Sequence, residues 1–184
     1  MKEKLNSILR EDRFEHSVNV MECAVKLSVC YKEDPDKAAI AGLLHDCARF
    51  LEPEEMLRLC EKLDIITDDV RKENPKHLHD VLGVFFAEKE FGVSDPEILS
   101  AIRSHTTGSE NMTRLQKIVF LADFIEPGRK FKGVEELRDL AFEDLDKAVL
   151  KALDHTIRFV LKKGQLLHMD TVNARNWLLR DINK

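Results

Sequence analysis

The stretch AIAGLLHDCARF, residues 39–50, sets two ionisable side chains, His45 and Asp46, inside an otherwise apolar and helix-like run. Burying such groups costs free energy unless they find polar partners. A hydrogen-bond network and a metal ion are the two kinds of partner that satisfy an adjacent imidazole and carboxylate. The stretch therefore predicts a core helix that brings polar chemistry into the interior of the protein.

The hydrophobic pattern on both sides of this stretch is helical. Apolar residues recur at intervals of three and four along most of the 184 residues, while strand-like alternation is scarce. The sequence predicts an all-α fold, with an irregular region from Ile65 to Pro75. The expected helices cover residues 2–10, 13–31, 36–50, 53–63, 76–91, 95–106, 112–125, 133–142, 144–163 and 170–182.

Size and charge limit the functions to consider. With 43% hydrophobic residues, the chain is long enough for one good core, so residues 1–184 are expected to form a single domain. A net charge of -5 argues against a nucleic-acid partner, because tight binding to a phosphate backbone needs dense Lys and Arg surfaces. An apolar strip on the later helices could support a homodimer.

Features that indicate a membrane or an exported protein are missing from the sequence. It contains no run of about 18 apolar residues, and its charged start MKEKLNSILRED lacks the apolar centre of a signal peptide. The four cysteines form no C-x-x-C pair, which is typical of reduced thiols rather than of a zinc ribbon or a disulfide framework. The protein is expected to be cytoplasmic, with no membrane partner.

Several further polar residues interrupt apolar faces in the same way as His45 and Asp46. They are His16 in RFEHSVNVM, His79 in HLHDVLG, His105 in AIRSHTTG and Asp123 in IVFLADFIEPGR. Taken singly, each is explained by a hydrogen-bonded core position. Imidazole nitrogens and carboxylate oxygens are also the ligands that divalent iron, manganese and zinc accept. Together they predict one metal with open positions, or two metals that share a bridging carboxylate.

The order and surroundings of these residues resemble a known superfamily. The pattern resembles that of the metal-dependent phosphohydrolases of the HD-domain superfamily, whose fold is a helical bundle with the metal site in its core. The residues that carry this resemblance, all on expected helices, are His16, His45-Asp46, His79, His105 and Asp123. Five short motifs resemble the YqeK-like family of symmetrical diadenosine tetraphosphate hydrolases. They are RFEHSVNV, AGLLHDCAR, AIRSHTTG, LADFIEPGR and TVNARNWLL. The resemblance spans roughly residues 10–180.

The resemblance implies roles for the polar residues. His16, His45, Asp46 and Asp123 would hold a first metal, iron by analogy with the family, although manganese and cobalt accept the same ligands. His79 and His105 would either hold a second metal or face the phosphates, and one of them would protonate the leaving phosphate. Asp46 would then act as both a ligand and an acceptor of the water proton.

Phosphate recognition calls for cations beyond the metal. Arg13 lies three residues before His16, hence on the same side of the expected helix, and Arg129 follows the helix that carries Asp123. Both correspond to family positions that contact the nucleotide. Lys76 either faces the phosphates or belongs to a charged loop.

A late segment also resembles a family loop that contacts the nucleotide. The resemblance implies that His168 and Thr171 would reach ribose, base or phosphate. Met169 stands where the family usually carries a proline, which leaves the backbone path of this loop open.

The leading hypothesis is thus a metal-dependent hydrolase that cleaves diadenosine tetraphosphate symmetrically to two ADP through a metal-activated water. An HD-type nucleotidase acting on mononucleotides, and a nucleotide-binding sensor with little turnover, are the alternatives. A helical interaction protein with core histidines is a third reading, which requires the ligands to lie apart in space.

Overall fold

The computed structural model describes residues 1–184 and consists of helices joined by turns and loops, without strands. The predicted all-α fold is confirmed. The helices are α1 (Lys2–Ile8), α2 (Glu11–Cys30), α3 (Pro35–Leu44), α4 (Pro53–Lys62), α5 (Asp69–Glu73), the 3-10 helix η1 (Pro75–Leu78), α6 (His79–Phe91), α7 (Pro96–Ser104), α8 (Arg114–Ile125), α9 (Val134–Glu143), α10 (Leu145–Lys162) and α11 (Met169–Ile182).

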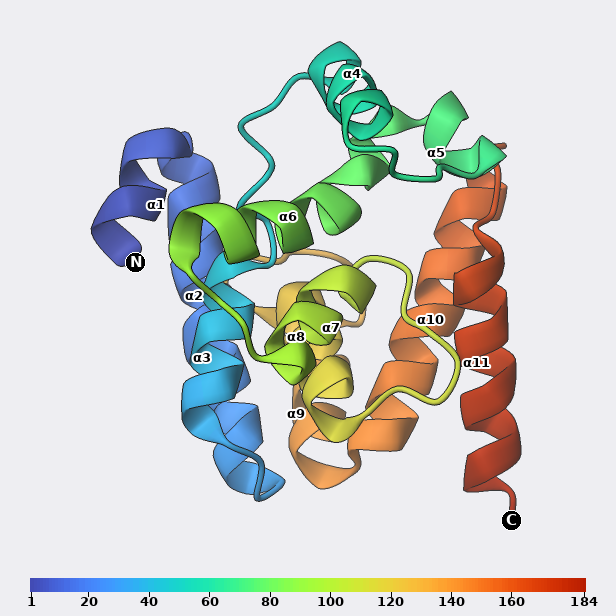
Figure 1. Ribbon diagram of the computed structural model, residues 1–184. Coiled ribbons are helices and arrows are strands. Elements are labelled where there is room, and N and C mark those ends of the chain that lie inside the picture. Colours follow the sequence, from blue (N-terminus) through green and yellow to red (C-terminus); the bar gives the residue numbers. More distant parts are fainter.

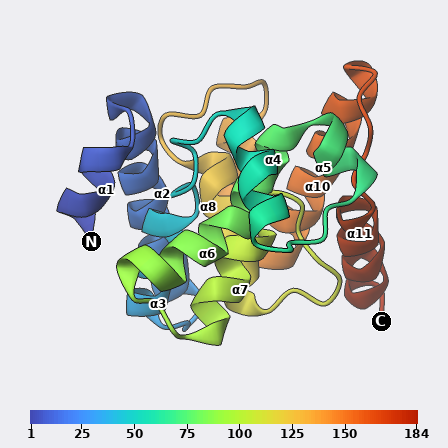
Figure 2. The same cartoon turned by 45° about the horizontal axis from the view of Figure 1, so that its top comes forward.

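The helices surround α8, which lies at the centre of the bundle. In Figure 1, α2 and α3 pack together on one side and α10 and α11 on the other, with α7 and α8 between them. The segment containing α4, α5 and η1 covers the top of the bundle above α6, as the turned view in Figure 2 shows. Helices distant in sequence therefore meet around α8.

The apolar interior forms one large and one small cluster. The large one contains 33 buried residues and extends from Leu5 on α1 to Leu178 on α11. The small one contains five residues, among them Met56 on α4 and Leu82 on α6. The small cluster attaches the α4–η1 segment to the rest of the bundle.

Helices α2 and α3 approach closely because α3 carries a glycine at the contact. A Cβ atom on Gly42 would lie 3.0 Å from the Cα atom of Met21 and 3.3 Å from the Cβ atom of Ala24. A larger residue would force the two helices apart. The close packing brings His16 on α2 near His45 at the end of α3.

The helix predicted over residues 36–50 is shorter than expected, and this prediction was wrong for residues 45–50. Helix α3 ends at Leu44, and residues 45–50 form turns in which Cys47 N donates to Leu44 O at 3.0 Å and Arg49 N to Asp46 O at 2.9 Å. Residues 41–48 are all buried, both inside the helix and after it. Their hydrophobic pattern therefore could not show where the helix ends. His45 caps the helix and Asp46 follows it.

Three other expectations need correction. The helix predicted over 95–106 ends at Ser104, so His105 also lies at a helix end rather than within a helix. The region from Ile65 to Pro75, expected to be irregular, contains the short helix α5. The helix predicted over 76–91 is divided into η1 and α6, with His79 as the first residue of α6.

A bilayer-spanning segment is not among these helices. Even α2, the longest at 20 residues, carries charged side chains along its length.

Candidate metal centre

Five elements bring the predicted ligands to one buried place beside α8. The ligands are His16 on α2, His45 and Asp46 at the end of α3, His79 at the start of α6, His105 at the end of α7, and Asp123 on α8. Ligand atoms of five of these residues form two groups of three that share His45, within 4.8 Å of one another in each group. One group is His16, His45 and Asp123, and the other is His45, Asp46 and His105. His79 belongs to neither group, but its Nε2 atom lies 3.3 Å from Oδ1 of Asp46, so the structure brings all six residues together.

Each imidazole is fixed through the nitrogen that points away from the centre. His45 Nδ1 donates to the carbonyl of Gly42 at 2.7 Å, three residues earlier. His79 and His105 repeat this arrangement, donating to the carbonyls of Lys76 and Ile102, both at 2.6 Å. Because Nδ1 donates its proton to a carbonyl in each case, Nε2 is directed to the centre.

His16 is oriented by a carboxylate in the same manner. Its Nδ1 atom lies 3.1 Å from Oε1 of Glu126, whose side chain is buried, and its Nε2 atom lies 3.0 Å from Oδ1 of Asp123. A carboxylate behind a metal-binding imidazole fixes the ring and makes the ligand nitrogen more basic.

The chemistry of these donors fits a divalent metal ion. His45 Nε2 is buried and has no hydrogen-bond partner, although it lies 3.7 Å from Oδ2 of Asp46 and 3.8 Å from Oδ1 of Asp123. A buried polar atom without a partner is costly, and a lone pair between two carboxylates cannot be satisfied by either of them. A cation within reach of these three atoms would satisfy all of them.

The two carboxylates are held in the ionised form that binds metals. Burial by itself would raise the pKa of Asp46, but the surrounding imidazoles and Arg49 keep that pKa well below the usual value. Burial opposes ionisation of Asp123 as well, and its hydrogen bond with His16 is the largest effect that lowers its pKa.

The imidazoles differ in their tendency to hold a proton. Burial lowers the pKa of His45 to about 4 and that of His79 to about 3, so both are neutral at pH 7. Burial also acts on His16 and His105, but a neighbouring carboxylate outweighs it in each case and raises the pKa above the usual value.

His79 and His105 form a pair at the side of the centre. Their Nε2 atoms lie 3.0 Å apart, and the hydroxyl of Thr106 lies 3.1 Å from the first and 3.0 Å from the second. His79 Nε2 is also 3.3 Å from Oδ1 of Asp46. The two imidazoles thus share one polar cluster with the Asp46 carboxylate.

Three guanidinium groups surround the carboxylates. Arg13 Nη1 lies 3.4 Å from Oδ2 of Asp46, and Arg49 Nε lies 3.1 Å from Oδ1 of the same residue. Arg129 pairs with the Asp123 carboxylate and also donates to its carbonyl at 2.7 Å. All three arginine side chains keep partial exposure to solvent.

The remaining predicted residues lie apart from the four imidazoles. The Lys76 side chain is exposed, and only its carbonyl takes part, as the acceptor for His79. His168 is buried, and its Nε2 atom lies 3.0 Å from Oδ2 of Asp68. Thr171 is buried in the first turn of α11.

His168 belongs to a separate network of buried ion pairs around Arg71. The Arg71 side chain is 5% exposed and donates to His168 Nε2 at 2.6 Å and to Oδ2 of Asp80 at 2.7 Å. Arg103 donates to the same Asp80 oxygen at 3.0 Å. This network connects the α5 segment with the start of α11.

Sequence reasoning missed three residues of the centre. Glu126, Arg49 and Thr106 each stand within three residues of a predicted ligand, and that proximity is the only signal the sequence carries. Their contacts depend on where helices distant in the chain meet, which spacing does not reveal.

A cavity of about 280 Å³ opens beside the centre, with His105, Asp123 and Arg129 in its wall. A larger hollow of about 430 Å³ lies next to Tyr31, Arg114 and Asp146 and contains none of the residues of the centre. The smaller cavity is therefore the candidate substrate-binding cavity.

Comparisons with known proteins agree with this arrangement. The family model described as HD domain matches residues 13–128. The chain is 43% identical to the symmetrical bis(5'-nucleosyl)-tetraphosphatase of Halalkalibacterium halodurans. It is 39% identical to the enzyme of the same name from Bacillus subtilis. Each match covers 93% of this chain and 91% of the other protein.

A solved structure is similar over nearly the whole length. The crystal structure of a "predicted HD superfamily hydrolase involved in NAD metabolism" from Clostridium acetobutylicum has a TM-score of 0.94 and 46% sequence identity. The match covers 98% of this chain and 95% of that one.

Proposed function

This chain belongs to the HD domain family, and we propose that it is a hydrolase that cleaves diadenosine tetraphosphate symmetrically to two molecules of ADP. The observation that carries the proposal is the set of four Nε2 atoms and two carboxylates beside the 280 Å³ cavity, with the buried His45 Nε2 lacking a partner. The names of the relatives supply the dinucleoside substrate, and the donor set supports phosphate hydrolysis.

His16, His45, Asp46 and Asp123 would hold the metal, for which iron is our proposal and manganese or cobalt would meet the same ligands. When bound, such an ion lowers the pKa of a coordinated water toward about 7 and neutralises charge on phosphoryl oxygens. Asp46 Oδ1, which faces His79 and His105, is the nearby oxygen that accepts a proton from the attacking water.

The leaving ADP needs a proton on the oxygen that bridged the two inner phosphorus atoms. His105 Nε2 is the suitable donor, because the Asp46 carboxylate outweighs burial and raises the pKa of His105, whereas His79 is neutral. The neutral His79, 3.0 Å away, accepts a hydrogen bond and holds His105 in place. Water adds to one inner phosphorus, the bridging P–O bond breaks, and the proton from His105 completes ADP.

Arg13 and Arg129 are the proposed phosphate contacts. Both guanidinium groups are partly exposed, and each already lies against a ligand carboxylate. Planar guanidinium groups match phosphate oxygens in a bidentate manner, so these side chains would hold the tetraphosphate across the centre.

The experiment that tests this function is product analysis with a defined metal. Protein loaded with Fe²⁺ or Mn²⁺ should convert diadenosine tetraphosphate to ADP alone, without ATP and AMP. Asp46→Asn should lose at least about a hundredfold in turnover, because it removes a ligand and a proton acceptor at once.

Asp69→Asn is the matched control, since the Asp69 side chain is 96% exposed. Release of orthophosphate from mononucleotides without cleavage of the dinucleotide would instead identify a nucleotidase. Tight nucleotide binding by fully metal-loaded protein without any turnover would identify a sensor.

A further inference from the structure

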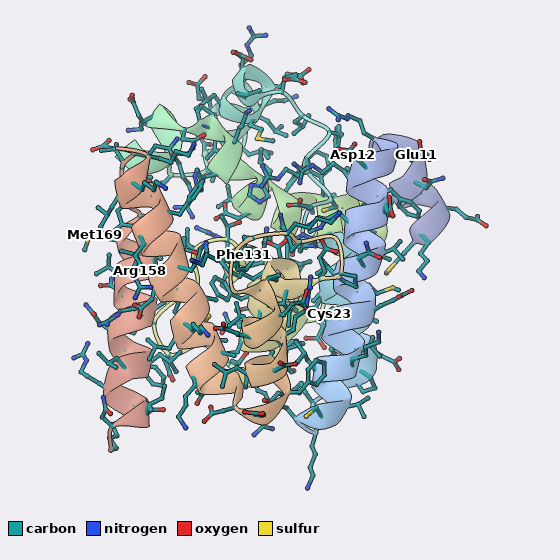
Figure 3. All side chains as sticks on the ribbon, turned by 180° about the vertical axis from the view of Figure 1, so that it is seen from behind. Glu11, Asp12, Cys23, Phe131, Arg158 and Met169 are labelled. Atoms are coloured by element: carbon teal, nitrogen blue, oxygen red, sulfur yellow. The ribbon has the colours of Figure 1, made fainter.

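An aromatic wall continues the cavity away from the metal centre. The wall consists of Phe124 on α8, Phe131 on the following loop, and His155 and Phe159 on α10. The first three rings contact one another, with centroid distances of 5.2 Å for Phe124–Phe131, 4.7 Å for Phe131–His155 and 5.5 Å for Phe124–His155. Figure 3 shows Phe131 near the middle of the molecule in the view from behind.

Phe159 is not explained by packing in the core. Its side chain is 52% exposed, and it belongs to neither apolar cluster. It stands one helical turn from His155, so the two rings lie on the same face of α10. Lys163 Nζ lies over the Phe159 ring, 5.7 Å from its centroid, and the ring also lines the cavity, where an aromatic ligand can stack on it.

The Thr156 hydroxyl beside this wall has only an acceptor to offer. The Thr156 hydroxyl donates its proton to the carbonyl of Ala152 at 3.1 Å. Its oxygen lone pairs remain free, and Thr156 lines the cavity between His155 and Phe159. A ligand that meets this oxygen must therefore bring a donor, such as the exocyclic amine of adenine.

We propose that Phe124, Phe131, His155 and Phe159 form a nucleobase subsite, in which one adenine of the substrate stacks on the rings and its amine donates to Thr156 Oγ1. This inference rests on the proposed function and assigns a place to one end of the substrate. The cavity begins at Asp123 and His105, so a base in the subsite is joined through its ribose and phosphates to the centre.

The volume of the cavity agrees with a single nucleoside. Pockets that enclose a complete drug-sized ligand measure roughly 300–1,000 Å³. At about 280 Å³, this cavity takes one end of the dinucleotide and leaves the other end outside it.

The first test compares two ligands on Mn²⁺-loaded protein by calorimetry. Stacking on an aromatic ring strengthens binding of a base substantially, so Phe159→Ala should weaken ADP binding about tenfold or more and leave inorganic pyrophosphate binding unchanged. Phe131→Leu, which preserves apolar volume but removes the ring, should act in the same direction. Phe142→Ala on α9 is the matched control, because Phe142 is 44% exposed and lies outside the cavity.

The second test concerns the hydrogen bond. Wild-type protein should bind ADP more tightly than IDP, whose base carries a carbonyl oxygen in place of the amine. Thr156→Val keeps the branched shape and removes the acceptor, so the ratio of the two dissociation constants should fall toward one. Thermal unfolding of each variant verifies that it remains folded.

The outcomes separate this inference from the function on which it rests. If wild-type protein produces ADP from diadenosine tetraphosphate while Phe159→Ala and Phe131→Leu bind ADP normally, the subsite is wrong and the function stands. An equal loss of ADP and pyrophosphate binding in both variants would also overturn the subsite. If both variants lose ADP binding selectively but no dinucleotide is cleaved, the subsite stands and the function is wrong.

Discussion

At the scale of single residues, the centre depends on atoms behind its ligands as much as on the ligands. Three of the four imidazoles donate Nδ1 to a carbonyl three residues earlier, and the fourth, His16, depends on Glu126. A backbone carbonyl is always present after a suitable turn, whereas Glu126 is a side chain that substitution can remove. His16 is therefore the imidazole whose orientation is easiest to disturb.

We expect Glu126→Ala to lower metal affinity about 10- to 100-fold, as is usual when the partner behind a metal-binding imidazole is lost. Competition with a chromophoric chelator for Mn²⁺ measures this change. Glu22→Ala, an exposed position on the same helix as His16, serves as the control and should bind metal like the wild type. Unchanged affinity in Glu126→Ala would mean that Glu126 does not orient His16.

The sequence could predict which residues meet at the centre but not how they are held. Imidazoles and carboxylates inside apolar runs stand out, and the structure brings all six of them together. Glu126 contacts a histidine 110 positions away, and nothing in its neighbourhood indicates that pairing. The contacts of His155 with two phenylalanine rings likewise join residues distant in the chain, and local sequence does not indicate them.

At the scale of elements, the segment around α5 is held by charge rather than by an apolar stripe. Its residues DVRKE offer a single aliphatic side chain, which is why periodicity predicted an irregular region there. The helix is capped by Asp68, whose side chain accepts from Arg71 N at 2.9 Å, and it is attached to the bundle through Arg71. Polar contacts between distant residues thus made a helix that local pattern could not reveal.

We expect Arg71→Met to destabilise the protein by about 3 kcal/mol, because it leaves the fully buried Asp80 carboxylate short of a partner. Arg103→Met removes the other cation from the same carboxylate, but this arginine is 41% exposed, so the cost should be about 1 kcal/mol or less. Urea unfolding of the two variants measures the difference. Equal losses would show that burial of Arg71 does not decide its contribution.

The two shortened helices follow from the position of the centre. Helices α3 and α7 both end where their histidines begin, and the negative end of a helix dipole favours a cation. A continuous helix through His45 and Asp46 would separate the two side chains by about 100°. The turn after Leu44 instead allows both to face the same point, an advantage that hydrophobic periodicity does not report.

At the scale of the whole molecule, one apolar cluster connects the first helix with the last. Residues 1–184 are therefore expected to unfold as a single unit. The homodimer that apolar residues on the later helices suggest stays a prediction. The HD domain match ends at residue 128, but α10 packs on α8 and joins the later helices to the same core.

We expect removal of the metal to lower the unfolding temperature in one cooperative transition. An ion present at about 100 times its dissociation constant stabilises the folded state by about 2.7 kcal/mol. For a chain of this size that corresponds to about 5–10 °C. Calorimetry with and without a chelator measures the shift. His45→Ala should abolish it, and two separate transitions would contradict the single unit.

The pairing of Arg13 and Arg49 with Asp46, and of Arg129 with Asp123, has a thermodynamic consequence. On the proposed function, a metal ion bound by these carboxylates would free the guanidinium groups for phosphate oxygens, so we expect metal and nucleotide to strengthen each other's binding. Linkage makes this assistance reciprocal: whatever factor the ion adds to nucleotide affinity, the nucleotide adds to retention of the ion. We therefore expect the metal to be held less tightly once the product has left, and a chelator to remove it most easily from the enzyme without nucleotide.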